Sequence, residues 1–244
     1  MSARITFATA GRVLRQLRRD PRTIALVLVV PPMMLTLFRF VFDGEPRTFD
    51  RIGPPLVGIF PFISMFLVTS IAMLRERTSG TLERLMSMPL GRLDLLIGYA
   101  LAFALVASIQ ASVASAVAFG ALGLDVAGPV SLVVLLAVGN AILGVSLGLF
   151  LSAFATSEFQ AVQFMPAVIF PQLLLCGLFV ARERMAGILE AASAALPMTY
   201  IYDALSRATA GQTDWRLAID ASVVLGAALV ALTLGAMTLR RRTA

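Results

Sequence analysis

The side chains that usually carry out catalysis or hold metals are nearly missing from this sequence. Its basic residues are all arginine, it has no histidine, and its single cysteine, Cys176, lies in an apolar run. A Walker A phosphate loop requires lysine, whereas histidine-based triads and HExxH zinc sites require histidine. We therefore expect no catalytic residue, no cofactor and no metal site, and one cysteine cannot form an intrachain disulfide.

Three neutral polar side chains interrupt the apolar runs: Gln110, Asn140 and Gln172. They could line the path of a transported molecule, or they could form hydrogen bonds between packed helices, which is the commoner role in membrane bundles. No pair of carboxylates stands in the middle of an apolar run. This absence disfavours an ion-coupled carrier and an intramembrane protease.

One long polar segment, Arg75–Asp94, separates two apolar runs of membrane length. It has the marks of a short helix, because Thr78 or Ser79 can cap an N-terminus and Pro89 can end the helix. A plain turn between two spans needs far fewer residues. The segment is therefore expected to be structured and to have a role of its own.

The helix expected in this segment has two faces. Leu82, Leu85 and Met86 follow one another at i, i+3 and i+4 and share an apolar face, while Glu83 points elsewhere. A helix of this kind could dock onto another protein, or it could lie on the membrane and contact only lipid headgroups. We favour the docking surface because the segment is long, structured and two-faced.

The elements that carry these residues are expected to be membrane spans. The sequence is 59% hydrophobic, with a mean hydropathy of +0.89 and only 14% charged residues, which predicts an all-α polytopic membrane protein. We expect one domain over 1–244 with six spans, at 23–42, 52–74, 95–120, 130–154, 161–180 and 215–239. Pro31 and Pro32 are expected to kink the first span.

Residues 1–20 are expected to form an amphipathic helix at the membrane interface. Phe7, Ala10 and Leu14 recur at helical spacing, and an opposing stripe of arginines begins at Arg12. After this helix, Asp20-Pro21 predicts an N-cap followed by the first position of the next helix. No convincing cleavage site follows, so we expect the segment to be retained and not removed as a signal peptide.

Small residues recur every four positions in two of the expected spans. They are Ala104, Ser108, Ser112, Ala116 and Gly120 in span 95–120, and Asn140, Gly144, Gly148 and Ser152 in span 130–154. Small side chains let helices approach closely in lipid, where packing drives association. Both stripes are therefore predicted to face neighbouring helices.

The distribution of arginine predicts the topology. Arginines are concentrated at both ends of the chain and in 75–94, which places these parts in the cytoplasm and the multi-pass chain in the plasma (inner) membrane. Segment 181–214 is then external, with a short helix that dips into the outer leaflet. The net charge of +6 follows from arginines that flank spans, so it does not indicate a nucleic-acid partner.

Three stretches resemble one family, the type-two permeases of ATP-binding-cassette (ABC) exporters, including the daunorubicin-type drug-efflux permeases. The matching residues are Glu76, Gly80, Thr81, Leu82, Glu83, Leu85 and Pro89; the short loop Thr156–Ala161; and Pro197, Tyr200, Asp203 and Arg207. Asp20-Pro21-Arg22 also fits. The sequence departs from the family at 176–180, where members often have serine before the glycine and a proline after the phenylalanine.

The resemblance implies a fold and a set of partners. In the family, two subunits of six helices each stand side by side above two ATPase subunits, and the segment matching Arg75–Asp94 is the coupling helix that contacts the ATPase. It implies that Pro197, Tyr200, Asp203 and Arg207 belong to an external re-entrant segment. We expect Tyr200, Asp203 and Arg207 to hold this segment to the last span, since Asp203 and Arg207 are one helical turn apart.

The function expected from these features is that of a non-catalytic permease subunit of an ATP-driven exporter. It would move an amphipathic drug, antibiotic or lipid-like molecule out of the cell, with membrane lipids, an ATPase subunit and a second permease subunit, identical or not, as partners. The alternative is a secondary transporter or membrane scaffold without an ATPase partner.

Overall fold

The computed structural model describes residues 3–86 and 91–238, and the regular elements in this part of the chain are all helices. In order they are α1 (Ala3–Arg18), α2 (Pro21–Val41), α3 (Pro46–Thr78), α4 (Thr81–Met86), α5 (Arg92–Ala116) with a π-helical turn (Val117–Ala121), α6 (Val130–Leu151), α7 (Glu158–Leu175), a 3₁₀ turn (Arg182–Arg184), α8 (Gly187–Ala194), α9 (Pro197–Thr209) and α10 (Trp215–Thr238). The all-α prediction is confirmed.

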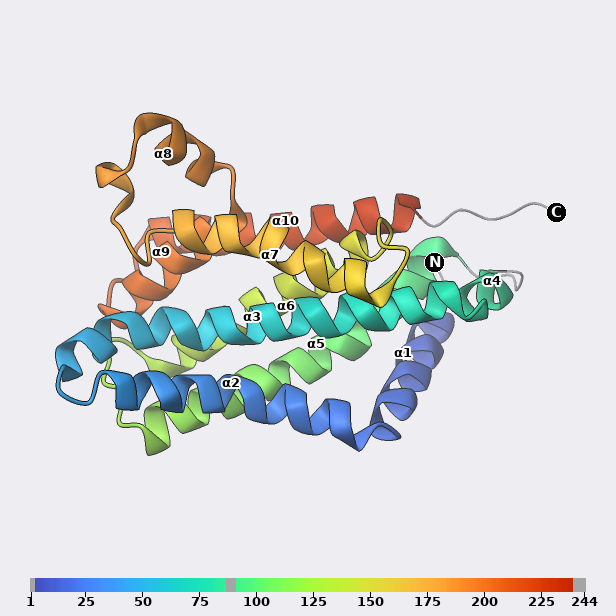
Figure 1. Ribbon diagram of the computed structural model, residues 1–244, viewed down its shortest axis with the longest axis horizontal. Coiled ribbons are helices and arrows are strands. Elements are labelled where there is room, and N and C mark those ends of the chain that lie inside the picture. Colours follow the sequence, from blue (N-terminus) through green and yellow to red (C-terminus); the bar gives the residue numbers. More distant parts are fainter. Residues whose placement is uncertain (1–2, 87–90, 239–244) are drawn as a thin grey trace.

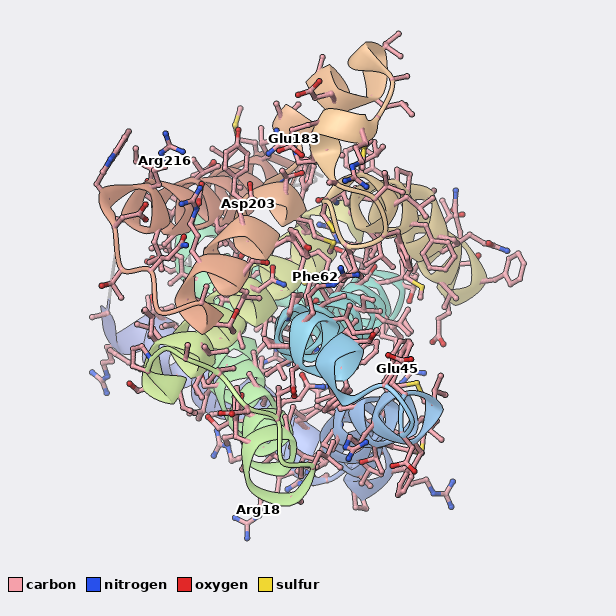
Figure 2. The ribbon with its side chains drawn as sticks, turned by 90° about the vertical axis from the view of Figure 1, so that its left-hand side faces the viewer. Arg18, Glu45, Phe62, Glu183, Asp203 and Arg216 are labelled. Carbon is pink, nitrogen blue, oxygen red and sulfur yellow. The ribbon has the colours of Figure 1, made fainter. Side chains whose placement is uncertain are left out.

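The long helices run side by side as a bundle, and the short helices lie at its two ends (Figure 1). We call one end, with α1, α4 and the last described turn of α10, the α4 end, and the other, with α8 and α9, the α9 end. Seen from the α9 end, Phe62 of α3 lies inside the bundle and α8 stands away from it (Figure 2). The central helix is α6, which packs against α3, α5, α9 and α10.

Five helices in the described residues are long and apolar enough to cross a membrane: Pro21–Val41, Thr48–Thr78, Leu93–Ala121, Val130–Leu151 and Trp215–Thr238. Each overlaps one of the expected spans. The remaining expected span, 161–180, corresponds to α7, whose polar glutamines and two internal prolines lower its hydropathy and which ends at Leu175. A multi-pass membrane protein is confirmed, while the crossing by α7 stays a prediction.

The first loop is shorter than expected, because α3 begins at Pro46. The sequence predicted a polar loop over Asp43–Arg51 and a span from Ile52, but Pro46 occupies the first turn of a helix that continues for 33 residues. Proline suits this position because its missing N–H would have no partner there. Phe49, expected in the loop, is instead buried against the core.

The prediction of close packing is confirmed for the stripe on α6. A Cβ atom on Gly144 would lie 2.4 Å from the carbonyl oxygen of Phe62, and one on Gly148 would lie 2.5 Å from that of Phe66. The backbones of α6 and α3 therefore approach too closely for any side chain at these positions. In the stripe that begins on α5, by contrast, Ala104 and Ser108 are half-buried, whereas Ser112, Ala116 and, in the π-helical turn, Gly120 are exposed, so the described helices cover it only in part.

Gly144→Ala is expected to lower the thermal stability of the purified protein, because the new methyl group would meet the rigid backbone of Phe62. Overpacking of this kind typically costs about 1–3 kcal/mol. Gly139→Ala on the same helix is the matched control, because a Cβ there meets nothing within 4 Å. Equal melting temperatures for the two variants would contradict the close α3–α6 contact.

The N-terminal helix α1 packs on the bundle more closely than an interfacial helix requires. Thr6 and Thr9 are buried, and both lie against Gly98 of α5. Phe7, expected on the apolar face, is 68% exposed, so it is available to lipid. Asp20 caps α2 as predicted, since its side chain accepts hydrogen bonds from the amide and hydroxyl of Thr23, which hold the pKa of this carboxyl below its usual value.

Candidate functional site

Segment Arg75–Asp94 was predicted to contain one short helix, and the structure divides its described residues among the end of α3, α4 and the start of α5. Thr78 is the last residue of α3 and Ser79 is its C-cap, so neither caps α4 and this expectation was wrong. Gly80 reverses the chain with a φ of +71°, and α4 begins at Thr81. The signal for this arrangement is the glycine itself, because glycine is the usual residue just after a helix C-terminus.

The apolar face predicted for α4 is present and points into the protein. Leu82 is buried, and Leu85 packs against the same core cluster, which includes Ala10 of α1 and Leu95 of α5. The short helix is therefore attached to the bundle through its leucines. The side chains of Glu83 and Met86, and the whole of Pro89, lie outside the described residues.

An ion pair joins α1 to the last turns of α3 at this end. Arg12 Nη1 donates to Glu76 Oε1 at 3.2 Å, and Arg12 Nη2 donates to the hydroxyl of Tyr99 on α5. The Arg12 guanidinium also stands over the Tyr99 ring, 5.4 Å from its centroid. Three helices thus meet around one guanidinium, which the sequence had placed in the arginine stripe opposite the apolar face of α1.

Glu76 was expected on a surface that contacts the ATPase, but the structure places its side chain inside the bundle. The residue is 5% exposed, and its carboxylate is held inside the chain by Arg12. A buried carboxylate of this kind requires a cationic partner to offset the loss of hydration. The other predicted coupling positions, from Gly80 to Leu85, lie on α4 or in the turn before it.

A second ion pair joins the end of α3 to the start of α7. Arg75 donates to both carboxylate oxygens of Glu158, from Nε at 2.6 Å and from Nη2 at 3.1 Å. Both side chains are more than half exposed, so the pair adds little stability by itself. Ser157 caps α7 by accepting from the amide of Gln160, which fixes the loop that resembles the family pattern.

At the α9 end, Asp203 and Arg207 have different partners from those expected. Asp203 pairs with Arg182 at 3.2 Å, and Arg207 pairs with Asp214 at 3.2 Å and with Asp220 of α10 at 3.7 Å. Arg207 thus holds the segment to the last helix as predicted, whereas Asp203 ties α9 back to the chain that follows α7. Spacing alone had suggested a pair within α9.

The polar contacts of α8 and α9 make this segment a compact unit. The Tyr200 hydroxyl donates to the carbonyl of Ala194, and Arg182 also donates to Ser193 at the end of α8. Burial raises the pKa of the Asp203 carboxyl, and the charges of Arg182 and Arg207 oppose that rise. Pro197 occupies the first turn of α9, where proline is favoured.

Asp203→Ala is expected to change transport several-fold while leaving assembly with an ATPase intact, because it frees Arg182 at the end of the molecule opposite α4. Glu183→Ala is the matched control, since Glu183 is an exposed acidic residue of the same segment. Transport by reconstituted vesicles and co-purification are the two measurements. Loss of assembly in Asp203→Ala would show that the residue serves folding instead.

The three polar residues of the apolar runs form hydrogen bonds inside the bundle. Gln110 Nε2 donates to the carbonyl of Val27 and to the hydroxyl of Ser64, and Asn140 Nδ2 donates to the carbonyl of Gly58 at 3.0 Å. Gln172 donates within α7. These contacts favour helix packing over a transport path for Gln110 and Asn140, which join α5 and α6 to their neighbours.

Comparison with known proteins identifies the family. Residues 5–209 match the family model described as ABC-2 type transporter. The chain belongs to the ABC-2 type transporter family. This confirms the resemblance to type-two permeases, and it makes the chain a membrane component of the ABC transporter class.

Individual relatives agree with this membership. The chain is 29% identical over 136 residues to the ABC transporter G family member 20 of Dictyostelium discoideum, covering 55% of this chain and 19% of that protein. It is 30% identical over 134 residues to the probable multidrug ABC transporter permease YbhR of Escherichia coli K12, covering 55% of this chain and 36% of that protein. The matches therefore span about a third of these relatives or less.

Proposed function

We propose that this ABC-2 family member is the membrane subunit of an ATP-driven exporter that moves an amphipathic small molecule out of the cell. A separate ATPase subunit hydrolyses ATP and docks on α4, and a second permease subunit, identical or not, completes the membrane part. The chain itself lacks the lysine of a phosphate loop. The multidrug name of the bacterial relative supports a drug-like cargo.

The observation that carries this proposal is the attachment of α4. The helix lies between the ends of two membrane-length helices, α3 and α5, and its leucines are set into the core that both helices share with α1. A displacement of α4 by a docked partner must therefore move these helices, whereas a loosely tethered loop would absorb it. This is the mechanical property that a coupling helix needs.

Topology gives a first test of the proposal. A cysteine replacing Ser79, an exposed residue in the turn before α4, is expected to react with a membrane-impermeant maleimide only from the cytoplasmic side. A cysteine replacing the exposed Glu190 of α8 is expected to react only from outside. Native Cys176 is buried, which keeps its background reaction low. The reverse pattern would overturn the orientation.

The direct test is reconstitution with the cognate ATPase. The complex is expected to hydrolyse ATP and to respond to an amphipathic substrate, whereas the purified chain alone is expected to show no turnover above background. Stoichiometric ATP hydrolysis by the isolated chain would contradict the assignment as a permease subunit. Failure of the two proteins to co-purify would favour a transporter or scaffold without an ATPase.

A further inference from the structure

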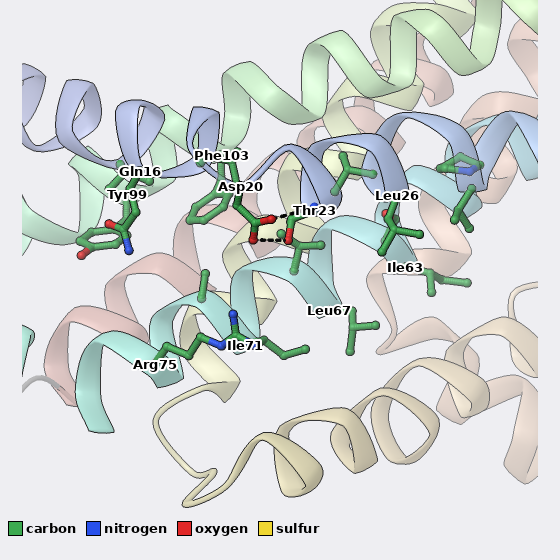
Figure 3. Close-up of a pocket in the computed structure, with 18 of the residues that line it drawn as sticks. Gln16, Asp20, Thr23, Leu26, Ile63, Leu67, Ile71, Arg75, Tyr99 and Phe103 are labelled. Atoms are coloured by element: carbon green, nitrogen blue, oxygen red, sulfur yellow. Dashed lines mark hydrogen bonds between the residues drawn. The ribbon is translucent and has the colours of Figure 1, made fainter. Parts of the chain in front are cut away.

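A cavity of about 650 Å³ opens between α1, α2, α3 and α5 near the α4 end (Figure 3). Its α3 wall is apolar, because Ile63, Leu67 and Ile71 follow one another one turn apart. Its α2 wall carries Leu26, which is 63% exposed, and only 17% of the most apolar stretch of α2 is buried. In a membrane, the mouth of this cavity is therefore within reach of lipid chains.

The apolar wall has about the length of one lipid leaflet. From Phe60 to Ile71, which both line the cavity, α3 rises about 16 Å at 1.5 Å per residue, and half of a hydrocarbon core measures about 15 Å. The cavity volume also falls in the range of about 300–1,000 Å³ typical of ligand sites. An acyl chain lying along α3 therefore matches the cavity in chemistry and in length.

A second hollow, of about 420 Å³, lies beside this cavity on α1. The residues that line it are Arg12, Arg15, Gln16 and Arg19. Gln16 also lines the apolar cavity, at the same end as Tyr99 (Figure 3). One amphipathic molecule can therefore occupy both spaces, with its head on one side of Gln16 and its chain on the other.

Two of the three arginines in the hollow have no acidic partner. Arg12 is held by Glu76 and by the hydroxyl of Tyr99. Arg15 and Arg19, by contrast, are exposed and form no ion pair with any residue that the structure describes. They lie one turn apart on one face of α1, so both guanidinium groups are available to the same anion.

Acidic groups near the hollow already have partners within the chain. None lines the hollow itself, and the two that line the apolar cavity are Asp20 and Glu76. Asp20 accepts from Thr23 and is attracted by Arg75, and Glu76 is bound by Arg12. An anionic head in the hollow therefore meets two unpaired cations and no unpaired carboxylate.

We propose that the two spaces hold one anionic phospholipid, with its phosphate at Arg15 and Arg19 and an acyl chain along α3. Guanidinium groups bind phosphate through charge-assisted and often bidentate hydrogen bonds. A basic helix alone would attract anionic headgroups in general. The adjoining cavity instead selects a single lipid and fixes where its chain lies. The proposal depends neither on the exported molecule nor on an ATPase.

The test uses the purified full chain in phosphatidylcholine nanodiscs that contain one of two photoreactive lipids. Both carry the same diazirine acyl chain, and the head is either phosphatidylglycerol or phosphatidylcholine. Cross-linked peptides are identified by mass spectrometry. At equal mole fraction, we expect the phosphatidylglycerol probe to label the cavity walls on α2 and α3 at least about tenfold more, which corresponds to roughly 1.4 kcal/mol.

Charge variants test the head site. The double variant Arg15→Gln with Arg19→Gln is expected to reduce phosphatidylglycerol labelling of these walls to the phosphatidylcholine level. Arg4→Gln is the matched control, because Arg4 is an exposed arginine of the same helix that does not line the hollow. General attraction of lipid by a basic helix would be weakened by either change, whereas a defined site responds only to the first.

Bulky variants test the place of the chain. Leu67→Trp is expected to fill the cavity and to remove labelling of its walls by both probes. Leu229→Trp, at a 64% exposed position of α10, is the control and should leave the labelling unchanged. If Leu67→Trp does not fold, Leu26→Trp at the exposed mouth of the cavity tests the same space.

Four results would overturn the inference: equal labelling by the two lipids, a preference that survives the double arginine variant, an equal loss in Arg4→Gln, or labelling that the tryptophan in the cavity leaves unchanged. Competition by glycerophosphoglycerol, which is the head without acyl chains, would also contradict it and indicate a site for a soluble anion. Labelling confined to monomeric chains would make a second copy the occupant in the assembled protein.

Discussion

Arg12→Ala is expected to destabilise the purified chain by roughly 3 kcal/mol, because it leaves the buried Glu76 carboxylate without its cation. The estimate lies at the low end for broken buried ion pairs, since the Arg12 side chain keeps 30% of its surface exposed. The variant also removes the contacts of the guanidinium with Tyr99. Thermal unfolding in detergent measures the loss.

Arg15→Ala is the matched control for this prediction. Arg15 lies one turn away on the same helix, is exposed, and donates to the carbonyl of Gly11 within α1. The double variant Arg12→Ala with Glu76→Gln should recover part of the stability, because the buried charge is then removed together with its partner. If the Arg12 and Arg15 variants unfold at the same temperature, the cluster does not hold α1 to α3.

Glu83→Arg is expected to uncouple or dissociate the ATPase while the permease still inserts normally. Leu82 and Leu85 of α4 pack inward, and helical spacing predicts that Glu83 lies on another face, where a docked protein would meet it. Removing one partner of a desolvated charge pair across an interface typically costs about 2–5 kcal/mol, and reversing its charge adds repulsion. The measurements are co-purification and substrate-stimulated ATP turnover.

Glu83→Gln separates the charge from the shape of the side chain. It should weaken the complex less than Glu83→Arg, because it removes the attraction without adding a repulsive charge. Gly80→Ala tests the geometry of the same turn: a Cβ there meets nothing within 4 Å, so any defect must come from the left-handed backbone conformation. If Glu83→Arg leaves the assembly of the complex and its ATP turnover unchanged, α4 is not the surface on which the ATPase docks.

Long apolar segments made most of the fold predictable. The helices α2, α5, α6 and α10 lie close to their expected spans because hydropathy over twenty residues is a strong signal. The wrong predictions concern the ends of helices, where a single residue can determine whether a helix begins or stops. Pro46 begins a helix although proline is read as a loop residue, and Gly80 ends one although Thr78 and Ser79 look like caps.

The contacts of the candidate site could not be predicted, because they depend on tertiary packing. Arg12 and Glu76 are 64 residues apart, and nothing in the arginine stripe of α1 marks Arg12 as the one that turns inward. For Asp203 the local rule favoured Arg207, four residues on, but the fold brings Arg182 within 3.2 Å. Sequence identified which charged residues to examine and not which of them meet.

The glycine contacts between α3 and α6 also limit how the molecule can change shape. With backbone set against backbone at Gly144 and Gly148, and Asn140 bonded to Gly58 beyond them, the two helices cannot slide past one another without collision. We therefore expect α3 and α6 to move together as one rigid unit that runs from the α4 end toward α9. If α4 is the coupling helix proposed above, a displacement that reaches α3 should be passed on to α6 as well, along the whole length of their contact.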